Sequence, residues 1–150
     1  MMILALAFHI LGAVVWVGGM FFAYMVLRPS TGPLDTATRL PLWHRVFTRF
    51  FRWVWLSIVA LLLSGFTMVF VGFGGFASLP TYVRVMMMLG VTMTIIYAYV
   101  YFVPWQRFRR AVSASDWPMG AKDLNRIRVL VAVNSALGLL TVVVGTAGRY

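Results

Sequence analysis

The chain contains no cysteine, only two histidines and only three acidic residues in 150 positions. The absence of cysteine excludes disulfides, thiolate metal sites and iron–sulfur clusters. The acidic residues, Asp35, Asp116 and Asp123, all lie between long apolar segments. Acid–base or hydrolytic chemistry that needs a carboxylate is therefore excluded within those segments. Any metal or cofactor chemistry must rely on very few side chains.

Charged residues are scarce, whereas apolar residues dominate. Hydrophobic residues make up 62% of the chain and charged residues 11%, against roughly 45–50% and about 25% in soluble domains. Four stretches reach the roughly 20 residues that a helix needs to cross a hydrocarbon layer. None of them shows the alternation of apolar and polar residues that is typical of a membrane β-strand. We therefore predict an all-α, integral membrane four-helix bundle that forms a single domain over residues 1–150. The expected helices are at about 2–27, 42–71, 80–103 and 124–147.

The net charge of +10 is concentrated in two alternate connections. Five arginines lie within residues 28–52, and five arginines with one lysine lie within residues 104–128. By the positive-inside rule both connections face the cytoplasm, so both termini face outward. The charge therefore indicates topology in a lipid bilayer, and no nucleic-acid partner is expected.

Proline, serine and glycine mark the expected helix ends. We expect the first helix to end at Arg28-Pro29 and the second to begin near Pro41, which suits a first-turn position. Ser78 and Pro80 favour a cap and an early-turn proline for the third helix. The third helix should then end near residue 104, and residues 113–120 form the longest hydrophilic connection.

Small and polar residues recur at helical spacing in the last apolar segment, at Asn134, Gly138, Thr141 and Gly145. In membranes such a stripe lets helices approach closely and hydrogen-bond to one another. A mid-helix amide needs a partner, so we expect Asn134 to bond to a neighbouring helix.

His9 is the most informative single residue, because an ionisable side chain in a membrane segment usually faces the bundle interior and marks a functional site. At about 1.5 Å per residue it lies about 10 Å below the outer end of its helix. The third helix enters the membrane from the same side, so three of its residues lie at a depth similar to that of His9: Met86, Met87 and Met88. Met68, near the outer end of the second helix, is close to the same depth. Imidazole and thioethers together suit Cu(I). We predict a copper site formed by His9 with one or more of these methionines, unless the methionines only fill gaps.

Haem b is the alternative cofactor, held by His9 with an axial methionine. Arg84, about one turn above the methionines, would then pair with a propionate, or it would simply extend to the interface. His44 lies at the opposite end, more than about 20 Å from His9 by the same helical rise. A haem held by both histidines is therefore not expected. In a third reading the protein has no ligand, and His9 only hydrogen-bonds to another helix.

Residues 9–22, with the sequence HILGAVVWVGGMFF, resemble the first helix of the copper resistance protein D (CopD) family. They also resemble HemJ, a protoporphyrinogen oxidase with a similar first helix. A looser resemblance extends to residues 49–51, 64–66, 82–84, 134–138 and 148–149.

This resemblance implies a small protein of the bacterial inner membrane that handles copper or haem. His9 matches the family histidine, and Trp16 would shape its surroundings. HemJ-like chains carry a lysine where this chain has Arg84 and an acidic residue where it has Asn125, which argues against the enzyme. We therefore expect binding or translocation of copper, with a haem b redox protein or a HemJ-like oxidase as the alternative. CopD proteins are often longer, so this chain would be a core module or would form a homodimer.

Overall fold

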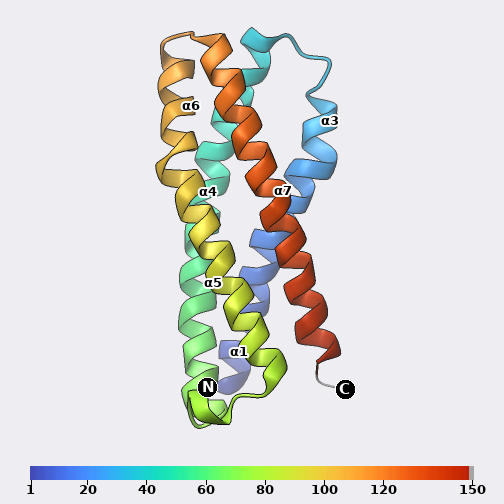
Figure 1. The fold of residues 1–150 in the computed structure, drawn as a ribbon, viewed down its shortest axis with the longest axis vertical. Coiled ribbons are helices and arrows are strands. Elements are labelled where there is room, and N and C mark those ends of the chain that lie inside the picture. The colour runs from blue at the N-terminus through green and yellow to red at the C-terminus, as the bar shows by residue number, and fades with distance from the viewer. Residues whose placement is uncertain (149–150) are drawn as a thin grey trace.

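The computed structural model describes residues 1–148, and in this range the chain forms a bundle of helices without β-strands (Figure 1). Four helical segments are long and apolar enough to cross a membrane: Met2–Ser30, Thr36–Gly72, Thr81–Ser113 and Trp117–Ala147. This confirms the predicted all-α membrane four-helix bundle. Arg149, which belongs to the last stretch of the family resemblance, lies outside the described residues.

The bundle has two distinct ends. The start of the first segment and the end of the fourth segment lie at the same end, at the bottom of Figure 1, which we call the terminal end. The two connections that carry most of the positive charge lie together at the opposite end, which we call the basic end. The arrangement agrees with the predicted grouping of the basic connections on one side.

The first segment is interrupted by two π-helical turns. α1 (Met2–Ala13) continues into η1 (Val14–Gly18), α2 (Gly19–Phe22), η2 (Ala23–Leu27) and α3 (Arg28–Ser30). Because a π-helical turn takes up extra residues, it changes which side chains face the neighbouring helices, and such turns are frequent at functional sites. η1 directs both Trp16 and Val17 into the protein interior.

The second segment begins earlier than predicted. α4 (Thr36–Thr67) continues into the π-helical turn η3 (Met68–Gly72), and Pro41 lies inside α4 instead of in its first turn. The reason is an N-terminal cap at Asp35, whose carboxylate accepts a hydrogen bond of 3.0 Å from the backbone N–H of Thr38. Hydrogen bonds from Thr38 also hold the pKa of the Asp35 carboxyl below its usual range.

The third segment does not end near residue 104 as predicted, because a further helix follows it. Ser78 belongs to the short 3₁₀ turn η4 (Phe76–Ser78), and Pro80 itself occupies the cap position of α5 (Thr81–Phe102), so the predicted serine cap is wrong. Val103 interrupts the helix with φ −112° and ψ −82°, because the Pro104 that follows it disfavours the helical conformation. The chain then continues as α6 (Pro104–Ser113).

The fourth segment, α7 (Trp117–Ala147), also begins before the predicted start at residue 124. The carboxylate of Asp116 accepts a hydrogen bond of 3.1 Å from the backbone N–H of Met119, which caps the helix. The connection expected over residues 113–120 is therefore reduced to a short turn after α6.

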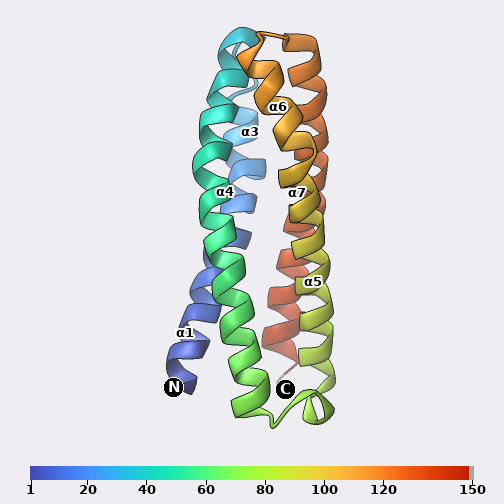
Figure 2. The same cartoon turned by 90° about the vertical axis from the view of Figure 1, so that its left-hand side faces the viewer.

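The helices associate as two pairs, α1 with α4 and α5 with α7 (Figure 2). The pairs join most closely toward the basic end, where α6 also packs against α7. The large side chains that are fully buried come mostly from this half: Leu40, Trp43, Val54, Pro104, Phe108 and Ile127. The arginines interleaved with the aromatic residues of α4 lie on its exposed side: Arg45, Arg49 and Arg52.

Candidate metal centre

His9 lies on the side of α1 that packs against α4, and its ring is partly buried. The Nδ1 atom lies 2.9 Å from Ser64 Oγ. Gly65 lies against the ring, since a Cβ atom at this position would be in van der Waals contact with His9 Cε1 at 3.4 Å. The imidazole is therefore directed toward the neighbouring helix and not into the surrounding lipid.

The hydrogen bonds of the Ser64 hydroxyl favour one tautomer of His9. Ser64 Oγ donates its single proton within its own helix, to the carbonyl oxygen of Ala60. With that bond in place Ser64 Oγ acts as an acceptor toward His9, and the tautomer with its proton on Nδ1 fits both bonds. The lone pair of Nε2 is left available, and a neutral imidazole held through its other nitrogen is the usual form of a metal-binding histidine.

Two methionines belong to the segments that meet in the contact between α1 and α4–η3, which we call the His9 seam. The backbone N–H of Met68 bonds to the carbonyl oxygens of Ser64 and Gly65, so Met68 lies one helical turn closer to the terminal end. Met2 lies seven residues before His9, on the same face of α1. A Cβ atom on Gly72 would lie 2.7 Å from Met2 Cε, which places this methionine against η3.

Met2 is a candidate ligand that the sequence analysis missed. The signal was available in the spacing of seven residues between Met2 and His9, which places both on one helical face. The His9 seam thus contains one imidazole and, closer to the terminal end, the two methionines Met68 and Met2. In the described part of the chain, no group of three or more histidine and acidic residues is arranged to hold a metal, so a site here would depend on thioether ligands.

The three consecutive methionines of α5 are not brought to the His9 seam. Met86 packs on α7, where a Cβ atom on Gly145 would lie 2.9 Å from its sulfur. Met87 and Met88 are exposed on the outside of the bundle, and Met88 is 68% exposed. Of the four methionines predicted from the sequence, Met68 lies on η3, which packs against α1.

The remaining predicted site residues are also spread along the bundle. The Arg84 guanidinium is exposed and donates a hydrogen bond of 3.2 Å to the carbonyl oxygen of Ala77. Trp16 is buried about two turns deeper than His9, with 3% of its surface exposed. His44 stacks on Trp105 near the basic end, with ring centroids 5.4 Å apart.

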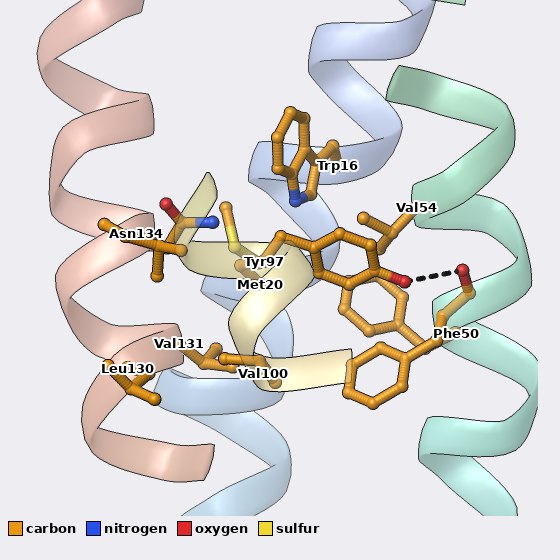
Figure 3. Close-up of a pocket in the computed structure, with 11 residues that line it drawn as sticks. Trp16, Met20, Phe50, Val54, Tyr97, Val100, Leu130, Val131 and Asn134 are labelled. Carbon is orange, nitrogen blue, oxygen red and sulfur yellow. Dashed lines mark hydrogen bonds between the residues drawn. The ribbon is translucent and has the colours of Figure 1, made fainter. Parts of the chain in front are cut away.

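A small cavity lies in the interior of the bundle, beside Trp16, Met20, Tyr97 and Asn134 (Figure 3). Its volume is about 10 Å³, far below the several hundred Å³ of typical cofactor pockets. A porphyrin does not fit it. Asn134 Nδ2 donates a hydrogen bond of 3.3 Å to the carbonyl oxygen of Met93, which confirms the predicted bond to a neighbouring helix.

Four apolar helical segments with buried polar contacts between them define a multi-pass helical membrane protein. The family described as Copper resistance protein D (CopD) matches residues 44–147. This match covers more than half of the chain, so the protein belongs to the CopD family, as the resemblance predicted. Searches of curated proteins and of solved structures gave no match.

Membership in this family identifies a membrane protein related to copper resistance. The matched residues include Ser64, Met68 and Asn134, whereas the first segment with His9 precedes them. The role of His9 and the relation to HemJ stay predictions.

Proposed function

We propose that the protein binds Cu(I) as its substrate on the His9 seam. His9 Nε2 and the thioether of Met68 are the proposed ligands, and Met2 is a further thioether at the terminal end. The observation that carries this proposal is the hydrogen bond between His9 Nδ1 and Ser64, because it leaves Nε2 available. The CopD family supports copper as the metal.

The chemistry of the ligands favours Cu(I) over divalent ions. Imidazole and thioethers are the borderline and soft ligands that suit Cu(I). They are also neutral, and no acidic residue lies beside them on the His9 seam. Because the cost of burying an ion in lipid increases steeply with its charge, a monovalent ion is the better match for such ligands.

The proposed direction of access follows from charge. Because the basic end should face the cytoplasm, the terminal end with the His9 seam faces the opposite side of a bacterial inner membrane. Copper would therefore reach this site from outside the cytoplasm. Deeper in the interior, the buried thioethers of Met20 and Met93 are candidates for a translocation path.

The two histidines provide a matched test. Cu(I) affinity of the purified full-length protein is measured by competition with a chromogenic Cu(I) chelator. His9→Ala should abolish binding at this site, because it removes the proposed nitrogen ligand. His44→Ala should retain the affinity of the unmodified protein, because His44 stacks on Trp105 near the basic end. Unchanged affinity and stoichiometry in His9→Ala would refute the proposal.

A further inference from the structure

Three arginines from three different segments lie around one tryptophan toward the basic end: Arg28 in α3, Arg39 in α4 and Arg128 in α7 (Figure 1). The Arg128 guanidinium lies over the ring of the buried Trp43, 5.5 Å from the ring centroid. Arg39 lies four residues before Trp43, which places both on the same side of α4. Arginines from two separate helices therefore meet at one aromatic side chain.

Hydrogen bonds connect Arg28 to the same place. Trp43 Nε1 donates a hydrogen bond of 3.1 Å to Thr31 Oγ1, and Thr31 Oγ1 donates one of 3.0 Å to the carbonyl oxygen of Arg28. The positive charges of Arg28 and Arg39 both act on the guanidinium of Arg128. The three side chains therefore form one group of charges, which we call the arginine cluster.

Within residues 1–148 the arginine cluster has no carboxylate partner. The carboxylates of Asp35 and Asp116 cap helices, and the buried Oδ2 atom of Asp123 has no hydrogen-bond partner. The one protein acceptor that the three guanidinium groups reach is the carbonyl oxygen of Gly32, at 3.5 Å from Arg39 Nη1. Because neighbouring positive charges repel one another, an anion bound between them would stabilise this arrangement.

Two of the three side chains are held by the protein, with their ends still accessible. The Nε atoms of Arg39 and Arg128 are buried, but both residues are only partly buried as a whole, and Arg28 is exposed. The terminal nitrogens are therefore the groups that a ligand can reach. Their planar arrangement of N–H donors matches the oxygen atoms of a phosphate group.

The arginine cluster lies at the level expected for phospholipid headgroups. Residues 2–27 contain no acidic or basic side chain before Arg28, and residues 129–147 contain none after Arg128. Both arginines therefore mark the ends of apolar runs, where hydrocarbon gives way to headgroups. Val26 and Val129, on the membrane side of the cluster, are exposed, so acyl chains can pack beside it.

We propose that the arginine cluster binds the phosphate group of an acidic phospholipid from the leaflet at the basic end. Basic pockets between membrane helices bind acidic headgroups in this way, and each guanidinium can pair with two phosphate oxygens. The bound headgroup would connect the first segment to α4 and α7. Because this site lies at the opposite end from the His9 seam, it does not depend on the copper proposal.

The test is native mass spectrometry of the full-length protein, released from neutral detergent micelles with added phosphatidylglycerol. We expect saturable binding of one phosphatidylglycerol, and no comparable binding of phosphatidylcholine, whose headgroup also carries a positive charge. Arg28→Gln and Arg128→Gln should each raise the Kd at least about tenfold, because each loses hydrogen bonds to a charged group. Arg49→Gln removes the same charge from the exposed side of α4 and should raise the Kd by about fivefold at most.

Three results would overturn the proposal. The first is the absence of saturable binding. The second is an equal rise of the Kd in Arg28→Gln, Arg128→Gln and Arg49→Gln, which would mean that charge acts without a defined site. The third is displacement of the lipid by inorganic phosphate or by a polyglutamate peptide at the same concentration, which would assign the cluster to a free anion or to an acidic protein.

A second measurement covers the case in which Arg128→Gln fails to fold. Because a ligand that binds only the folded state stabilises it, phosphatidylglycerol should raise the Tm of the unmodified protein in neutral detergent. The rise should be lost in Arg28→Gln, whose exposed side chain can be replaced without disturbing the core, and kept in Arg49→Gln. A rise of the same size in Arg28→Gln as in the unmodified protein contradicts the site.

Discussion

Ser64 determines how His9 is presented, because its hydroxyl holds the Nδ1–H of the imidazole. Ser64→Ala removes this bond and leaves the ring free to change orientation. We expect the Cu(I) affinity, measured by chelator competition, to fall about 10–100-fold, as is usual for the loss of a group that orients a metal ligand. Ser57→Ala is the matched control, since Ser57 is buried two turns away on the same helix. Equal affinities of the two variants would show that the hydroxyl has no positioning role.

Single residues also show what the sequence could predict. His9 stood out because an ionisable group is rare in a membrane segment. Its bond to Ser64 was not predicted, because serine in such helices commonly bonds to its own backbone, as Ser64 also does. Met86 was expected at the depth of His9, but depth alone does not specify the neighbouring helix. Its sulfur lies against Gly145 because α5 pairs with α7 and not with α1.

At the scale of helices, the stripe of small residues on α7 keeps the helix pairs in close contact. A Cβ atom on Gly138 would lie 2.8 Å from Val17 Cγ2 and 3.1 Å from Met93 Cε. We therefore expect Gly138→Ala to lower the free energy of unfolding by about 1–3 kcal/mol, the usual effect of overpacking. Unfolding in detergent micelles measures this change.

Gly90 in α5 is the control for this prediction, because a Cβ atom there would have no neighbour within 4 Å. Gly90→Ala should leave stability unchanged or increase it slightly, since alanine is the better helix former. A loss of stability in Gly90→Ala equal to that in Gly138→Ala would mean that helix packing at Gly138 is not the cause.

The helix boundaries show the limits of a hydropathy pattern. The pattern predicted the parts of the helices that cross the hydrocarbon layer, because only those parts must be apolar. It did not predict the extensions at the basic end, where α4 and α7 begin after capping residues Asp35 and Asp116. These extensions are stabilised by caps and by buried aromatic side chains such as Trp43 and Phe108, so they can carry exposed arginines.

At the scale of the whole molecule, the bundle is densely packed toward the basic end and consists of two less connected helix pairs at the terminal end. The aromatic groups of α4, α5 and α6 form a continuous network in the dense half, including a Phe51–Trp105 contact with ring centroids 5.2 Å apart. The His9 seam lies outside this dense core. Changes at His9 should therefore affect metal binding more than global stability.

The orientation in the membrane can be tested cleanly because the chain has no cysteine. Ser78→Cys introduces a thiol at the terminal end, and Ser113→Cys introduces one at the basic end; both positions are exposed. In intact bacterial spheroplasts, a membrane-impermeant maleimide should label Ser78→Cys at once, and Ser113→Cys only after lysis. The reverse pattern would place the His9 seam on the cytoplasmic side.

The most direct test of the copper proposal is X-ray absorption spectroscopy of the Cu(I)-loaded full-length protein. The account predicts a first coordination shell with both imidazole nitrogen and sulfur. The sulfur contribution should decrease in Met68→Leu and remain unchanged in Met88→Leu, because Met88 is exposed on α5. A shell without sulfur, or one that is the same in Met68→Leu as in the unmodified protein, would contradict a site formed by His9 and Met68.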